Sequence, residues 1–247
     1  LLLFHNAFLK MKDLIKQDKI GKIQYMYSNR LNLGTVRTEE NSLWSFAPHD
    51  ISLFQFFTES FPNQVTCSGG AFLQPHNHDT TVTVLEYPEN IKGHIFVSWL
   101  HPFKEHRFVI VGSKGMFVYE DSSSDKELLF YEKGIDWVNG EPIKRDGPTE
   151  KIAYDAYPPL KAEVEHFIEL IKTNTQTSKI SAEAGSDVLE ILTMAQESLE
   201  SGASKKEESK KKYFLHETAI VDEPSNIGTG TKIWHYSHVQ KNTTIGN

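Results

Sequence analysis

The sequence predicts an α+β chain, with an open, mainly antiparallel sheet that carries helices on one face, followed by the beginning of a left-handed parallel β-helix. Three observations lead to this fold class. Between residues 64 and 131, apolar residues recur at every second position, which is typical of half-buried strands. Apolar stripes at helical spacing lie before and after that region. From residue 221 to residue 245, every sixth residue is aliphatic, which is the period of such a solenoid.

The first elements follow from apolar spacing and from residues that end helices. Residues 6–18 predict a helix that stops before Gly21, and residues 23–33 predict a strand that ends at Gly34. Pro48 is expected to open a second short helix, because proline suits the first helical turn. The four bulky apolar residues that open the chain are expected to lie in a buried strand, so we expect the N-terminus to be cut.

The sheet is predicted from strands joined by short breaks. Residues 95, 97 and 99 share one face, and residues 94, 96 and 98 share the other. The breaks at 88–90, 101–102 and 112–115 are short enough for hairpins.

Two apolar stripes predict helices after the sheet, and both are expected to face the core. The first consists of Val164, Phe167, Ile168 and Ile171, and the second of Val188, Ile191, Leu192, Ala195 and Leu199. Residues 201–212 are almost entirely Ser, Lys and Glu, which predicts a charged linker. The expected organisation is a domain at 1–200, a linker at 201–212 and the start of a β-helix at 213–247.

The six-residue period defines the last segment. Five aliphatic residues are in phase, namely Val221, Ile227, Ile233, Val239 and Ile245. Solenoid coils bury their inward residues against the next coil, and five hexads make fewer than two three-sided coils. We therefore expect this segment to be an incomplete folding unit, with a cut C-terminus.

Composition narrows the classes of function. The formal charge of −7 argues against nucleic-acid binding, which relies on neutralising phosphates. The apolar runs are too short for a membrane helix. Cys67 is the single cysteine and cannot form an internal disulfide, which fits a cytoplasmic location. The segment 76–79 is expected to be a turn and not a metal site, and 112–115 a hairpin and not a phosphate loop. The Gly-x-Gly-x-x-Gly fingerprint of dinucleotide binding does not occur in the sequence.

The densest polar segment in an apolar setting is residues 44–50. If Pro48 opens a helix, His49 lies in its first turn, where the helix dipole keeps the imidazole neutral and able to accept a proton. Asp50 would steady the helix start or orient a neighbour. The alternative is that His49 makes an ordinary hydrogen bond at a helix start.

Residues 29–32 suggest a ligand-binding strand. Alternation puts Arg30 and Asn32 on one face and Asn29 on the other. Arginine offers a planar fork to carboxylate or phosphate, and asparagine offers both a donor and an acceptor to sugar hydroxyls. A surface ion pair is the alternative for Arg30.

Three segments, 29–34, 44–52 and 98–104, resemble the C-terminal domain of the glucose-fructose oxidoreductase/inositol dehydrogenase (Gfo/Idh/MocA) family. The likeness covers residues 1 to about 200 and is strongest to 3-dehydrogenases of UDP-N-acetylglucosaminuronate and related UDP-sugars. It implies a Rossmann domain that binds NAD or NADP ahead of this one, and oligomer contacts through the open sheet. It also implies that His49 is catalytic. The family often has Asp-x-Gly-x-His before this helix, and here only the histidine is kept.

The resemblance also implies a set of substrate-binding residues. Arg30, Asn32 and Arg37 would hold the sugar carboxylate or diphosphate, with Asn29 nearby, and Trp44, His101 and Lys104 would be weaker members of the pocket. Residues 213–247 separately resemble the start of a hexapeptide-repeat N-acetyltransferase of UDP-linked amino sugars, which would need acetyl-CoA only as a complete solenoid. His235 and His238 are expected to be structural.

The leading hypothesis is therefore part of an NAD(P)-dependent UDP-sugar 3-dehydrogenase of diacetamido-sugar and surface-polysaccharide biosynthesis, inactive without its Rossmann domain. Two alternatives stay open: an N-acetyltransferase whose activity lies in the solenoid, and a non-catalytic assembly module that uses the open sheet.

Overall fold

The computed structural model describes residues 1–175, 180–203 and 213–246. They belong to two compact units, Leu1–Gly202 and Ala203–Asn247. Of the expected linker, residues 201–203 continue the preceding helix, and residues 204–212 lie outside the described residues.

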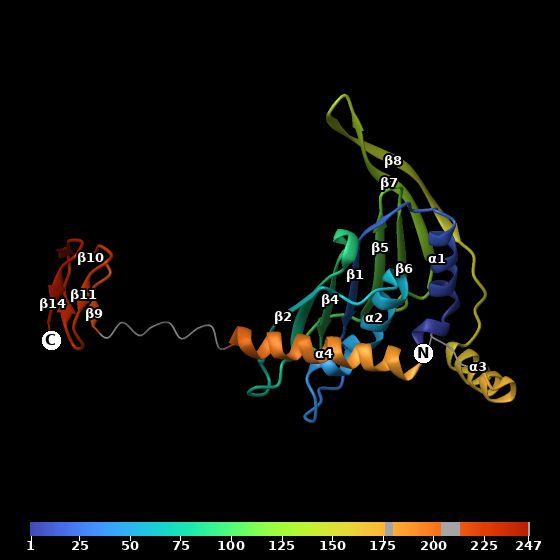
Figure 1. The fold of residues 1–247 in the computed structure, drawn as a ribbon, viewed down its shortest axis with the longest axis horizontal. Coiled ribbons are helices and arrows are strands. Elements are labelled where there is room, and N and C mark those ends of the chain that lie inside the picture. Colours follow the sequence, from blue (N-terminus) through green and yellow to red (C-terminus); the bar gives the residue numbers. More distant parts are fainter. Residues whose placement is uncertain (176–179, 204–212, 247) are drawn as a thin grey trace. The chain divides into compact units, whose positions relative to one another are not determined.

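The first unit is built on one mixed sheet of eight strands, in the order β2-β3-β4-β1-β5-β6-β7-β8 (Figure 1). All neighbouring strands are antiparallel except β1 and β4, which are parallel. The strands are β1 (Ile23–Leu31), β2 (Gln64–Gly70), β3 (Thr80–Glu86), β4 (Lys92–Ser98), β5 (Glu105–Gly112), β6 (Met116–Glu120), β7 (Leu128–Val138) and β8 (Glu141–Ile152). The α+β class and the mainly antiparallel sheet are confirmed.

The position of β1 corrects one predicted hairpin. Because β1 lies between β4 and β5, the break at 101–102 connects two strands that do not pair, so it is not a hairpin. The other two predicted hairpins are confirmed, since β3 pairs with β4 and β5 with β6. The sheet also continues beyond residue 131 into the long hairpin β7–β8, which projects past the other strands (Figure 1).

The start of the chain is helical. Leu2–Phe4 form a 3₁₀ turn, η1, so the expected buried strand is wrong there. Helix α1 (Asn6–Lys16) has His5 as its N-cap, and His5 Nδ1 accepts a hydrogen bond from the Ala7 backbone at 3.2 Å. The polypeptide leaves this helix through two residues with positive φ, Asp18 at 63° and Gly21 at 69°.

Helix α2 (Ser42–Thr58) starts six residues earlier than Pro48 predicted. Its N-cap is Asn41, whose side chain accepts a hydrogen bond from the Trp44 backbone at 3.1 Å. Pro48 therefore lies inside the helix, where it removes one backbone donor at a cost of about 3 kcal/mol. Burial of Ile51, Leu53 and Phe54 offsets this cost, because a fully buried side chain of this kind contributes roughly 1.5–3 kcal/mol.

The two later helices differ in what their apolar stripes contact. Helix α4 (Ala182–Ala203) buries Ile191, Leu192, Ala195 and Leu199 in the core, as predicted. Helix α3 (Pro159–Thr173) buries none of its residues, and Phe167 and Ile171 are 57% and 65% exposed. The predicted core contact of this stripe is wrong in the described unit. Helix α3 packs against η1, where the rings of Phe4 and His166 are 5.3 Å apart.

The core lies between the sheet and helices α1 and α2, which cover one face of it (Figure 1). Met26, Ile95 and Ile110 contribute from β1, β4 and β5 and are completely buried. Phe8 from α1 and Phe54 from α2 both pack edge-on against Phe108. Ile95, Val97 and Trp99, which were predicted to share one face, are all buried.

The second unit consists of six two-residue strands, β9 to β14. They pair in parallel between residues 18 positions apart, such as Ile220 with His238 and Asn226 with Thr244. The strands are Phe214–Leu215, Ile220–Val221, Asn226–Ile227, Lys232–Ile233, His238–Val239 and Thr244–Ile245. In each of the last five strands the in-phase aliphatic residue is less exposed than the residue before it. This pairing corresponds to three hexads per repeat.

Candidate active site

A buried ion pair joins β1 to α2. Arg30 donates from Nε to Asp50 Oδ2 at 2.8 Å and from Nη2 to Asp50 Oδ1 at 3.1 Å. The two side chains are 15% and 3% exposed. Arg30 faces the helices because it alternates with Asn29 on the strand, and Asp50 faces the sheet because it lies on the buried side of α2. The planar fork of Arg30 is thus engaged by a carboxylate of the protein itself.

His49 lies next to this pair on α2 and is exposed to solvent. His49 is the eighth residue of α2 and lies beyond the first turn. The prediction that the helix dipole keeps its ring neutral is therefore wrong. Its pKa is nevertheless lowered, first by partial desolvation from the surrounding protein and then by the positive charge of Arg30, while Asp50 opposes the change. A neutral, accessible imidazole can accept a proton. Among the described residues, Ser52 hydrogen-bonds to the backbone carbonyl of His49 at 2.7 Å, which leaves the imidazole ring to face solvent.

His106 is a member of this cluster that the sequence analysis missed. It lies on β5 directly opposite Arg30 in the antiparallel register, so the two side chains share a face of the sheet. Burial lowers the pKa of His106 to about 4, and the charges of Arg30 and Lys104 contribute to this decrease. The ring is therefore neutral near pH 7. The signal for it was the alternation of strand β5, in which Glu105, His106 and Arg107 take opposite faces in turn.

A chain of hydrogen bonds runs beside the cluster. His5 Nδ1 accepts from a backbone N–H, so its Nε2 carries the proton and donates to the Tyr119 hydroxyl at 3.1 Å. Tyr119 donates in turn to Asp121 Oδ1 at 3.4 Å, and Lys126 lies 3.0 Å from the same oxygen. Burial lowers the pKa of His5 and raises that of Tyr119. Burial also opposes ionisation of Asp121, but the hydrogen bond and charge of Lys126, with smaller effects of nearby histidines, outweigh it and lower the pKa of Asp121. The sequence analysis did not predict this chain either.

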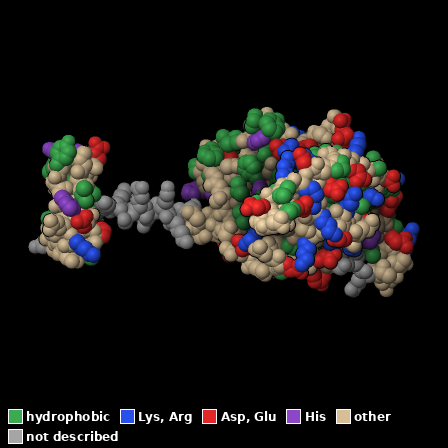
Figure 2. Space-filling model, turned by 90° about the horizontal axis from the view of Figure 1, so that it is seen from above, with side chains coloured by type: hydrophobic (Ala, Val, Ile, Leu, Met, Phe, Trp, Pro, Cys, Tyr) green, Lys and Arg blue, Asp and Glu red, His purple; other side chains and the backbone are tan. Residues whose placement is uncertain are grey.

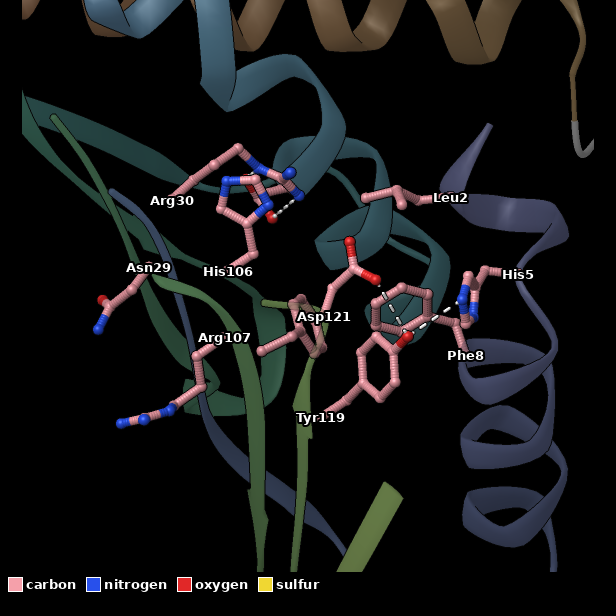
Figure 3. A pocket seen from close by; sticks show the side chains of 11 residues that line it. Leu2, His5, Phe8, Asn29, Arg30, His106, Arg107, Tyr119 and Asp121 are labelled. Carbon is pink, nitrogen blue, oxygen red and sulfur yellow. Dashed lines mark hydrogen bonds and ion pairs between the residues drawn. The ribbon is translucent and has the colours of Figure 1, made fainter. Parts of the chain in front are cut away.

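A cavity of about 20 Å³ lies between the ion pair and this chain of hydrogen bonds. Figure 3 shows Arg30, His106, Asp121, Tyr119 and His5 grouped around it, with Leu2 and Phe8 on the side of α1. In the same view Asn29 and Arg107 point away from the group. The cavity is large enough for one water molecule and too small for a substrate.

The other residues of the predicted substrate strand serve local contacts. Asn29 lies on the opposite face from Arg30, as alternation predicted, and donates from Nδ2 to Glu105 Oε1 at 2.7 Å. Arg107 lies on that same face and reaches Glu120 Oε2 at 2.8 Å. Asn32 follows the end of β1, and its backbone N–H bonds Ser98 at 3.1 Å.

Arg37 and Trp44 lie at a second candidate site, an open groove near the start of α2. Arg37 is exposed, and its Nη1 is 3.3 Å from Glu40 Oε1. Trp44 is partly buried and donates from Nε1 to Gln196 Oε1 at 3.2 Å. It lines an open groove of about 570 Å³ that Arg37 borders through its carbonyl group.

His101 and Lys104 lie in the loop between β4 and β5. The Nδ1 of His101 lies 2.9 Å from the Phe103 carbonyl oxygen, and its ring packs edge-on against Phe103. Lys104 is exposed two residues before His106, whose pKa it helps to lower. The structure therefore brings His49, Arg30 and Lys104 toward one region and Arg37 and Trp44 to another.

The charges on the surface are mixed. On the face of the first unit seen in Figure 2, Lys and Arg side chains are interspersed with Asp and Glu side chains. Among the described helices, none has both the length and the hydropathy that crossing a membrane requires. Within the described residues, no cluster of three or more His, Cys, Asp or Glu side chains is arranged to hold a metal ion.

Part of the first unit is similar to a known family of domains. Residues 8–118 match the family model of the GFO/IDH/MocA C-terminal domain. The matched segment extends from α1 through most of β6 and contains the Arg30–Asp50 pair, His49 and His106. The chain is therefore similar to this family over residues 8–118.

Solved structures share the fold of the first unit. The UDP-N-acetylglucosamine 3-dehydrogenase of Acidithiobacillus ferrooxidans matches with a TM-score of 0.63 and 19% identity, over 76% of this chain and 58% of that one. The aldose-aldose oxidoreductase of Caulobacter crescentus, complexed with glycerol, matches with a TM-score of 0.65 and 13% identity, over 81% and 60%. An oxidoreductase of Agrobacterium radiobacter in complex with NAD⁺, L-tartaric acid and magnesium matches with a TM-score of 0.60 and 14% identity, over 81% and 61%.

At such identities these matches show the fold, and the chain spans about 60% of the length of each of these structures. A search of curated proteins returned no significant match.

Proposed function

We propose that the first unit is the substrate domain of an NAD(P)-dependent oxidoreductase that oxidises the C3 hydroxyl of a UDP-N-acetylhexosamine or of its uronate. It would act together with a nicotinamide-binding domain, in the same chain or in another. The observation that carries this proposal is the exposed His49, whose pKa is lowered, next to the buried Arg30–Asp50 pair. The 3-dehydrogenase from Acidithiobacillus ferrooxidans shares the fold and supports this substrate class.

The chemical step proposed for this chain is removal of the proton from the hydroxyl group that is oxidised. Oxidation of a secondary alcohol removes a hydride from carbon and a proton from the hydroxyl group, and the nicotinamide takes the hydride. His49 would accept the hydroxyl proton, which its lowered pKa permits at neutral pH. Since the sequence has no dinucleotide fingerprint, the position of the cofactor is not assigned to the described residues.

The residues around His49 would position the proposed base and contact the substrate. Because Asp50 engages its guanidinium group, Arg30 would act mainly by fixing Asp50 beside His49. Lys104 and His101, on the loop after β4, would approach the diphosphate. Asn29, Asn32, Arg37 and Trp44 remain candidates for substrate binding. The open face of the sheet, where the rings of Tyr27 and His94 stack at 5.4 Å, is the proposed surface for homo-oligomer contacts.

The test is NADH formation from NAD⁺ and a UDP-sugar in the holoenzyme that combines these residues with the nicotinamide-binding domain. Replacing His49 with Gln is expected to lower kcat by about 10²–10⁴, the usual contribution of a general base. Ser52→Ala serves as the matched control, because it changes a nearby side chain of α2 that donates to the His49 backbone carbonyl and not to its ring. Equal activity of the His49→Gln variant would remove the basis of the proposal.

A second function is favoured for the second unit by its strand pairing. Parallel pairs 18 residues apart, with the in-phase aliphatic residues turned inward, support the start of a left-handed β-helix. Such a solenoid fits an N-acetyltransferase that uses acetyl-CoA and a UDP-amino sugar. An acetyl-transfer assay with UDP-3-amino sugar and acetyl-CoA tests it. No transfer by a protein with at least three stacked coils would contradict the proposal.

A further inference from the structure

The groove beside Trp44 has the size and the lining of a small-ligand site. It lies where the loop before α2 meets the loop between β2 and β3, close to α4, and has a volume of about 570 Å³. Small-molecule sites typically occupy about 300–1,000 Å³. The residues that decide its chemistry are Thr38, Glu39, Glu40, Trp44, Asn77 and Gln196.

One wall of the groove is an aromatic ring held in a fixed position. Trp44 donates to Gln196 Oε1 at 3.2 Å, and Asn41 Nδ2 donates to the same oxygen at 2.8 Å. Gln196 in turn lies next to Ala195, which is completely buried in the core. A ring already fixed before binding loses little conformational entropy when a ligand stacks on it.

The two loops are also tied together. The carbonyl oxygen of Arg37 accepts hydrogen bonds from Gln74 Nε2 at 2.9 Å and from Asn77 Nδ2 at 3.0 Å. The backbone N–H of Ser42 donates to the His78 carbonyl oxygen at 2.9 Å. The groove is therefore formed without a ligand.

The rim of the groove is acidic. Glu39 and Glu40 are on one side, and Arg37, the adjacent cation, is 3.3 Å from Glu40. A carboxylate or phosphate in the groove would meet the like charge of Glu39 and Glu40, and the described lining includes His76 but neither lysine nor arginine. Hydroxyl and amide groups, by contrast, can donate hydrogen bonds to carboxylates.

We propose that this groove binds an uncharged pyranose ring, stacked on Trp44, with its hydroxyl groups directed to Glu39, Glu40 and Asn77. The apolar face of a sugar ring can pack on the indole while its hydroxyl groups face the polar rim. The groove is lined by other residues than those around His49, so this binding goes beyond the proposed reaction.

Binding is tested on the chain by saturation-transfer NMR with N-acetylglucosamine and with glucuronate. Ring protons of N-acetylglucosamine are expected to receive saturation, and glucuronate is expected to bind about tenfold more weakly or not at all. Trp44→Ala should abolish the transfer, Trp44→Phe should keep part of it, and Glu40→Gln should reduce the discrimination against glucuronate. Trp137→Ala is the matched control, because that tryptophan is 72% exposed on the β7–β8 hairpin.

Several outcomes would overturn the proposal. They are the absence of transfer to N-acetylglucosamine, unchanged transfer in folded Trp44→Ala, and equal binding of glucuronate. If Trp44→Ala does not fold, the same NMR measurement is made on Thr38→Arg. Residue 38 is exposed and lines the groove, so an arginine there should fill the groove and abolish the transfer. His49→Gln separates the two proposals: it should leave sugar binding unchanged, so that binding without oxidation counts against the proposed reaction and not against the groove.

Discussion

Arg30 and Asp50 form a two-point ion pair that connects strand β1 to helix α2 below the exposed His49. Both groups are nearly buried, so each depends on the other for compensation of its charge. Asp50 also opposes the effect of Arg30 on the pKa of His49. The pair thus contributes to the stability of the domain and also influences the pKa of His49, the proposed base.

Removing one partner should be more harmful than removing both. Asp50→Asn leaves the buried guanidinium uncompensated and is expected to lower the free energy of unfolding by about 3–5 kcal/mol. The double variant Arg30→Met with Asp50→Leu is expected to lose clearly less. Urea unfolding of the single and double variants measures this, and a double variant that loses the sum of both single effects would contradict a coupled pair.

The same variants should move the pKa of His49 in opposite directions. Arg30→Met removes a charge that lowers this pKa, so the value should rise, whereas Asp50→Asn should lower it further. The comparison is an NMR titration of the His49 ring in each variant that remains folded. Shifts of the same sign in both would rule out an electrostatic effect of the pair on His49.

His106 should make stability depend on pH in the acidic range. Its pKa is about 4 in the folded protein and 6.5 in an unfolded reference, so the unfolded chain binds more protons between these values. The contribution is fully present above pH 6.5 and is lost as the pH falls toward 4, and His5 and His49, with lowered pKa values, act in the same direction. His106→Gln should flatten the change of Tm between pH 7 and about pH 4.5. An unchanged slope would show that His106 does not contribute.

The second unit should depend on its inward aliphatic residues. Ile233 and Val239 are 5% and 7% exposed, and Asp at either position would bury an unpaired charge. Ile233→Asp is expected to unfold the second unit and leave the first intact, as seen by loss of one set of NMR signals. Lys232→Asp, on the exposed side of the same strand, is the control and should be tolerated.

The sequence predicted well those features that depend on local periodicity. Alternation in 64–131 predicted the central strands, and the stripe of α4 predicted buried residues such as Ile191. It did not predict the start of α2, because the side-chain cap of Asn41 prevailed over the preference of Pro48 for a first turn. It also could not show that the stripe of α3 is exposed in this unit, since periodicity identifies an apolar face and not what covers it.

In the candidate site too, the sequence predicted the residues that local patterns identify and missed those that only tertiary structure brings together. His49 and Arg30 were identified from a short polar segment and from a resemblance, both of which are local in sequence. His106, Tyr119 and His5 come together only through the pairing of β1, β5 and β6 and the position of α1. Such contacts depend on tertiary structure, and strand alternation alone could have suggested only the face on which His106 lies.

The most direct test of the central claim is the rate of NADH formation with UDP-N-acetylglucosamine in the holoenzyme, compared between wild type and His49→Gln. The wild type should oxidise the sugar, and the variant should lose about 10²–10⁴ in kcat, with sugar binding retained. A His49→Gln variant as active as the wild type, or a wild-type holoenzyme that oxidises no UDP-sugar, would contradict the account.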